Sequence, residues 1–191
     1  MANKDRSMQR FTVQESTNIL LPRLIKVSPT IVADDNADDD VAFNWTKIEN
    51  ASTLEGHPTK LKSVVMLDPT VGLADIDLIF CRGAGADGTA PTTAQNLQDG
   101  ADGSAAVDIT AAEAVAINIC GSCKLVTSST NANTHESNLL TCQVLSRSDI
   151  NLIMAPASNS RDLYVGGIWR QEPADQSGGL TYIDLYLGFE G

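Results

Sequence analysis

A chain of 191 residues, of which 42% are hydrophobic, is long enough to bury the core of one compact domain. Its formal net charge of -11 at pH 7 gives a surface that repels nucleic-acid phosphates and anionic lipid headgroups. We therefore expect no nucleic-acid partner and no membrane partner.

The polar start of the chain lacks the apolar run of a signal peptide, and no stretch is apolar enough to span a bilayer. The four cysteines are few for a disulfide scaffold of this length. These two features predict synthesis in a cytoplasm with reduced thiols.

Residues 1–30 combine short β-favouring segments with Pro22 and Pro29, which suits an extended arm or an edge strand. We predict an N-terminal arm over 1–30 and a single β-sandwich domain over 31–191. Five carboxylates within residues 34–40 then indicate a loop, because like charges repel and Asp favours turns.

The next segments read as strands. One is predicted at 41–48 and another at 61–67, where Asp68 and the proline after it end the strand. Residues 75–81 alternate, with Ile76, Leu78 and Phe80 on one face, which is typical of a half-buried strand.

Residues 83–103 are rich in Gly, Ala, Asp, Thr and Pro, which predicts a long surface loop that carries at most a short turn. Thr110 and Glu113 have the spacing of a capping box, so a short helix is expected to begin there and to feed an apolar strand ending near Cys120. A further loop is predicted over 127–137.

Strands are then expected at 139–145, 150–154, 163–169 and 180–189. The last one alternates clearly: one face should fill the core and the opposite face carries two tyrosines. The core face comprises Ile183, Leu185, Leu187 and Phe189, and the other face includes Tyr182 and Tyr186. Short strands at regular spacing predict an all-β, mainly antiparallel fold of β-sandwich or jelly-roll type with one short helix.

Three glycines, Gly83, Gly85 and Gly88, follow a predicted strand with the spacing of a dinucleotide-binding loop. No long amphipathic helix follows them, and strands do not alternate with helices as a parallel sheet requires. A loop is therefore favoured over a cofactor site, and no cofactor is predicted.

Cys120 and Cys123 have the spacing of a zinc knuckle or a redox pair. The other residues that could complete such a site are Cys81, Cys142, His57 and His135. Because zinc sites usually show a second close pair, buried or solvent-facing thiols are favoured, and no metal is predicted. The acidic residues of 34–40 and 99–103 lack the closing Glu of a calcium hand, so solvated turns are favoured there.

Catalysis finds little support in the sequence. His57 and His135 lie in loop-like contexts away from a convincing nucleophile, and no Gly-x-Ser-x-Gly elbow occurs. We predict no catalytic residues and no enzyme activity. Carbohydrate binding stays open, and Asn44 and Asn50 begin glycosylation sequons that matter only in a secretory pathway.

One set of segments resembles a group of tailed-bacteriophage virion proteins. The likeness begins with the "S-V-x-x-L-D … A-x-L-D-L-x-F" type of block across 61–68 and 74–80, and covers about two thirds of the chain. Later segments follow in the same order: a short helix near 109–116, then 150–153, 160–168 and 185–189. The loops at 83–103 and 120–137 and the acidic N-terminal portion depart from the pattern.

The resemblance implies a capsid decoration or cement protein on the exterior of an icosahedral phage head, made in the host cytoplasm. Its expected partner is the major capsid protein, and it is expected to form a homodimer or homotrimer. An extended arm can clamp neighbours by strand addition, and capsid symmetry multiplies weak contacts. The residues predicted to contact partners are Phe11, Val13, Leu24, Ile25, Val27, Tyr182 and Tyr186. The alternative is a phage tail or host-adhesion component that binds carbohydrate.

Overall fold

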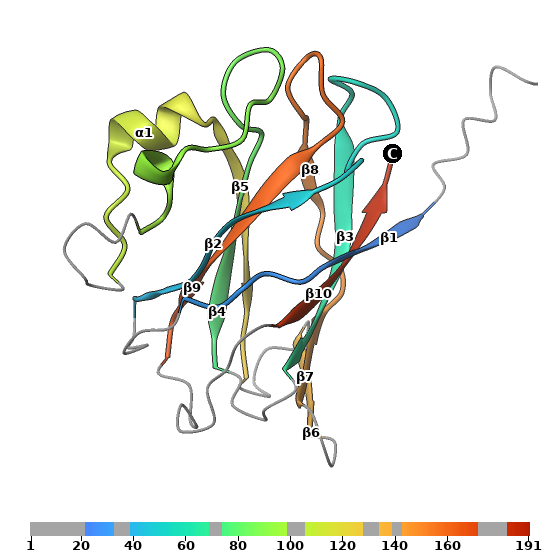
Figure 1. The fold of residues 1–191 in the computed structure, drawn as a ribbon. Coiled ribbons are helices and arrows are strands. Elements are labelled where there is room, and N and C mark those ends of the chain that lie inside the picture. Colours follow the sequence, from blue (N-terminus) through green and yellow to red (C-terminus); the bar gives the residue numbers. More distant parts are fainter. Residues whose placement is uncertain are drawn as a thin grey trace, which may run out of the picture.

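A computed structural model describes residues 22–32, 39–68, 74–98, 106–127, 134–138, 143–171 and 183–191. Over these residues ten strands form two antiparallel sheets that pack face to face (Figure 1). The prediction of a mainly antiparallel β-sandwich with one short helix is confirmed. No helix in the described ranges is long and apolar enough to cross a membrane.

The larger sheet has six strands. Five follow the order β1-β10-β3-β7-β6, and β8 pairs with the start of β3 on the same edge as β7, without pairing with β7. Their bounds are β1 (Arg23–Val27), β3 (Thr59–Asp68), β6 (Thr134–Asn138), β7 (Gln143–Arg147), β8 (Leu152–Met154) and β10 (Asp184–Glu190). The long strand β3 therefore holds the sheet together, with β10 on one edge and β7 and β8 on the other.

The smaller sheet has the order β2-β9-β4-β5. Its strands are β2 (Val41–Ile48), β4 (Ile76–Cys81), β5 (Ile119–Leu125) and β9 (Leu163–Trp169). The short helix α1 (Ala111–Ala116) precedes β5, and a 3-10 turn, η1 (Thr93–Gln95), lies in the loop after β4. Because β5 pairs only with β4 among the described strands, it forms one edge of this sheet.

The core lies between the sheets where both alternating strands were predicted to point. Ile183, Leu185, Leu187 and Phe189 are fully or almost fully buried, and so are Ile76, Leu78 and Phe80 in the smaller sheet. The predicted core faces of these two strands are confirmed, because a period of two places every second side chain on the same face.

The part of the predicted arm that is described is an edge strand. β1 pairs antiparallel with β10, from Arg23 opposite Phe189 to Val27 opposite Leu185. The chain then crosses to the smaller sheet, where the Val32 N–H donates to the Ala42 carbonyl at 2.9 Å. Residues 23–32 therefore close one side of the sandwich.

Three predicted boundaries are wrong. The strand expected to end near Cys120 instead runs from Ile119 to Leu125, because the chain turns at Asn118 (φ 56°) between α1 and β5. The loop predicted over 127–137 contains the polar strand β6, which is held by pairing with β7. The strand predicted at 139–145 is β7, over Gln143–Arg147.

Candidate functional site

The glycine pattern that suggested a dinucleotide loop builds a tight turn. Gly83, Gly85 and Gly88 all have positive φ, and Ala84 and Thr89 exchange two backbone hydrogen bonds of 2.8 and 2.9 Å. A Cβ on Gly83 would lie 2.6 Å from the Thr89 carbonyl oxygen, so this turn excludes a side chain there. The glycines shape the loop itself.

Burial slows the reactions of the described cysteines, and Cys120, which is only partly buried, is the most accessible of the three. Burial raises the pKa of Cys120 to about 11 and that of Cys81 and Cys123 to about 12, so all three stay protonated near neutral pH. Within the described part of the chain, no three His, Cys, Asp or Glu residues gather as metal ligands would. Cys142 lies outside the described residues, as does the side chain of His135.

The remaining sequence candidates are scattered. His57 is exposed in the loop between β2 and β3. Asn44 of the first sequon is committed to the fold, because its side-chain amide exchanges two 3.1 Å hydrogen bonds with the backbone of Gln98. Asn50 of the second sequon lies in an exposed turn. The acidic residues 34–38 and 99–103 lie outside the described residues, and Asp39 pairs with Arg170.

The first surface feature that could bind a partner is the outer face of the six-stranded sheet. Residues in register share a face, so Lys26, Tyr186, Val65 and Ser146 form one row across four strands. Lys26 lies 5.8 Å from the centroid of the Tyr186 ring.

The neighbouring row on this face contains Asp184, Leu67 and Val144. Asp184 accepts an ion-paired hydrogen bond of 2.9 Å from Lys26. Half-buried Val65, Leu67 and Val144 thus form an apolar stripe, with an ion pair and the ring of Tyr186 at one end.

The predicted partner residues divide between the two faces of this sheet. Leu24 is 68% exposed and, like half-buried Tyr186, points outward. Val27 is 5% exposed and Ile25 packs against the protein's own core, so these two stabilise the sandwich from within. Phe11, Val13 and Tyr182 lie outside the described residues.

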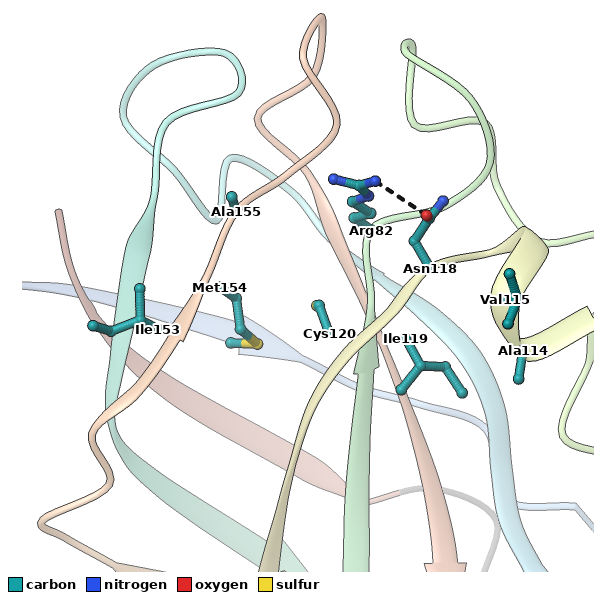
Figure 2. A pocket seen from close by; sticks show the side chains of 9 residues that line it. All are labelled: Arg82, Ala114, Val115, Asn118, Ile119, Cys120, Ile153, Met154 and Ala155. Carbon is teal, nitrogen blue, oxygen red and sulfur yellow. Dashed lines mark hydrogen bonds between the residues drawn. The ribbon is translucent and has the colours of Figure 1, made fainter. Parts of the chain in front are cut away.

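The second feature is an apolar hollow of about 530 Å³ between the two sheets, on the side opposite β1. Figure 2 shows Met154 of β8 and Cys120 of β5 pointing into the space between their strands, while Ile153 lies on the outer side of β8. Its lining residues are Arg82, Ala114, Val115, Asn118, Ile119, Cys120, Ile153, Met154 and Ala155.

The hollow begins where β5 and β8 separate. At Gly121 and Leu152 the strands are so close that a Cβ on Gly121 would lie 2.7 Å from the Leu152 side chain. Beyond this contact Ile153, Ile119 and Val115 are exposed by 66%, 41% and 75%. Arg82 donates a 3.0 Å hydrogen bond to the Asn118 side chain at the upper rim (Figure 2). The arrangement suits an apolar segment, because its one charged residue lies at the rim.

Sequence reasoning missed this hollow. One signal was present: Gly121 interrupts an apolar strand, and a glycine within a strand often marks close approach of another segment. The partner in that approach, Leu152, lies 31 residues further along the chain, and nothing local to either residue indicates the contact.

A third feature is a polar pocket of about 400 Å³ formed by loops at one end of the sandwich. Asp162 accepts hydrogen bonds from the Lys47 ammonium at 2.9 Å and from the Asn50 N–H at 2.7 Å. Burial disfavours the charged Asp162, but these donors outweigh it and lower its pKa. Asn159 in turn donates to Asp87 at 2.8 Å, so these side chains bind one another across the loops.

Comparison with known proteins adds no family to this description. No protein-family model matches the chain, and neither a curated protein nor a solved structure matches it.

Proposed function

We propose that this protein is a virion structural protein of the capsid decoration or cement type. It binds the exterior of an icosahedral phage head across neighbouring subunits of the major capsid protein, and it acts as a homodimer or homotrimer. The protein itself carries out no chemistry, and neither nucleic acid nor membrane is its partner. An acidic net charge of -11 is consistent with a surface that avoids the packaged genome.

The observation that carries the proposal is the outer face of the six-stranded sheet. An aromatic ring, an exposed leucine and a stripe of aliphatic side chains occur together there, which is the composition of a protein interface. Tyr186 combines apolar area with a polar tip, and Leu24 lies two residues from the start of the described chain. The face and the N-terminal segment are therefore contiguous.

Support also comes from the segments that resemble phage virion proteins. The block at 61–68 lies in β3, 74–80 leads into β4, and 185–189 lies in β10. These strands form the framework of both sheets, so the likeness falls on the parts of the chain that build the sandwich.

The test measures binding of the purified protein to heads that lack it, by co-sedimentation. Leu24→Glu and Tyr186→Ser should each weaken binding by about tenfold or more, because interface cores tolerate charge and lost ring area poorly. The matched control is Leu54→Glu, since Leu54 is 51% exposed in a loop away from this face. Wild-type affinity for all three variants, or no binding by the wild-type protein, would contradict the proposal.

A second function, a tail or host-adhesion protein that binds carbohydrate, is favoured by the polar pocket. Its lining of Asn, Asp, Glu, Lys and Arg offers both donors and acceptors to sugar hydroxyls. A glycan array separates the two proposals: specific glycan binding that is lost in Asn159→Ala favours adhesion, and an array without signal favours the capsid role.

A further inference from the structure

The apolar hollow lies between two strand edges that have no partner in the described part of the chain. β5 pairs only with β4 on one side, and β8 pairs only with β3. An edge strand presents unpaired N–H and C=O groups, which can bind an added strand. The hollow therefore offers backbone hydrogen bonds and an apolar floor in one place.

One part of the β5 edge is already blocked. The Arg147 guanidinium donates a 2.7 Å hydrogen bond to the carbonyl of Lys124, near the C-terminal end of β5. Next to the hollow, no other described side chain forms a hydrogen bond with the backbone of Ile119 or Cys120, although Leu152 packs on Gly121. An added segment would thus be confined to the end of β5 that borders the hollow.

Residues 1–21 are joined to the sandwich through the start of β1, which lies at the level of the hollow. Arg23 is opposite Phe189, Phe189 is opposite Leu61, and Leu61 is opposite Leu152. These four residues form one row across the sheet, and Leu152 is the residue that packs on Gly121 at the base of the hollow. The departure point and the hollow lie at the same end of the sheet but on opposite edges.

The sequence before β1 contains a segment suited to the hollow. Phe11, Thr12 and Val13 alternate apolar, polar, apolar, so an extended conformation would place both apolar side chains on one face. The eight residues between Val13 and Pro22, which make nine Cα–Cα steps, can span up to roughly 30 Å when extended. That reach is about the diameter of a small domain, so the segment can extend past its own copy.

We propose that residues 11–13 of one copy bind in the apolar hollow of a second copy, beside the free edge of β5 or β8. Donor and acceptor lie on opposite edges, so the contact is heterologous and closes into a ring of at least three copies, which selects the homotrimer of the two oligomers proposed above. Such an exchange assembles the homo-oligomer from the protein's own segments. It requires no capsid, and it therefore stands or falls separately from shell binding.

The experiment compares the full chain with a variant that lacks residues 1–21 and retains β1. Sedimentation equilibrium gives the oligomeric state, and alkylation by N-ethylmaleimide with peptide mass spectrometry gives the accessibility of Cys120. We expect an oligomer for the full chain and a monomer for the variant. Alkylation of Cys120 should be about tenfold or more faster in the variant, because a bound segment protects the thiol in proportion to its occupancy.

Two controls establish that the segment, and not damage to the fold, causes the change. Cys123, which is buried in the core, should react equally slowly in both proteins. In the full chain, replacing both Phe11 and Val13 with Asp should abolish the oligomer. Replacing both Gln14 and Ser16 with Asp, which adds the same charge, should leave it intact.

Two further measurements probe the acceptor. A synthetic peptide of residues 1–21 should protect Cys120 in the shortened chain, whereas a scrambled peptide should not. Ile119→Asp, at an exposed position in the hollow, should abolish assembly of the full chain.

Three results would overturn the exchange. They are a monomeric full chain with a reactive Cys120, an oligomer that persists without residues 1–21, and protection of Cys120 in a monomer at every concentration. The last result would place the segment in the hollow of its own copy. Binding to empty heads, measured separately, decides the proposed shell function whatever this experiment gives.

Discussion

At the residue scale, packing in β9 depends on two glycines that let large side chains approach its backbone. A Cβ on Gly167 would lie 2.4 Å from the Phe43 ring, and one on Gly166 would lie 2.6 Å from the Leu97 side chain. Phe43 and Leu97 are both buried, so neither can swing into solvent. The glycines thus allow β9 to be covered on both faces.

Gly167→Ala should lower the free energy of unfolding by about 1–3 kcal/mol, because the added methyl group overpacks the buried Phe43 ring. Urea denaturation measures the change. Phe43→Leu removes the clashing ring atoms, so the double variant should lose less stability than the two single variants combined. Strict additivity would contradict the contact.

The ion pair of Asp162 predicts a dependence on pH. Its pKa is lowered in the folded protein, so its stabilising effect is present above the unfolded pKa, about 4, and is lost as pH falls through the folded value. Asp162→Asn should therefore cost about 1 kcal/mol at pH 7. Below pH 3 the wild-type carboxyl is increasingly protonated and the difference should shrink. Urea denaturation at both pH values measures this, and an equal difference at both would contradict it.

At the element scale, strand pairing determines some elements that the local sequence does not predict. The strands at 41–48, 75–81 and 163–169 were predictable because their alternation or β-branched content is strong within a few residues. The polar strand β6 carries no such signal, since it is held by the register with β7. The hollow was not predictable, because Gly121 and Leu152 belong to strands of different sheets.

The position of β1 predicts where the N-terminal segment can be removed. At a protein concentration low enough for the full chain to be monomeric, deletion of residues 1–21 should leave the thermal unfolding midpoint nearly unchanged, because it spares β1. Deletion of residues 1–30 removes the strand paired with β10 and the buried Val27, whose burial alone contributes about 1.5–3 kcal/mol. The longer deletion should therefore lower the midpoint by several degrees in a thermal scan. Equal midpoints would show that β1 contributes nothing to the fold.

At the scale of the whole molecule, the two edges of the sandwich differ in kind. On one side, residues 23–32 run from the larger sheet to the smaller and close the gap between them. On the other side β5 and β8 separate beyond the contact between Gly121 and Leu152, toward Ile119 and Ile153, and leave an apolar hollow. Each copy therefore has one edge that carries the N-terminal segment and a different edge that accepts it. A two-fold contact would instead use the same surface on both copies.

Net charge then predicts how assembly responds to salt. Each copy carries a charge of -11, so copies repel one another, and at about 0.01 M salt a Debye length of roughly 30 Å extends this repulsion across a neighbouring domain. The proposed contact is apolar and is not weakened by screening. Association of the full chain should therefore strengthen as NaCl is raised to about 0.3 M, which sedimentation equilibrium measures. Positions 1–10 contain three basic residues and one acidic residue. Their attraction to the acidic surface of another copy would weaken as the salt concentration rises. Association that weakens with salt would mean that their attraction to acidic surfaces, and not the apolar hollow, holds the copies together.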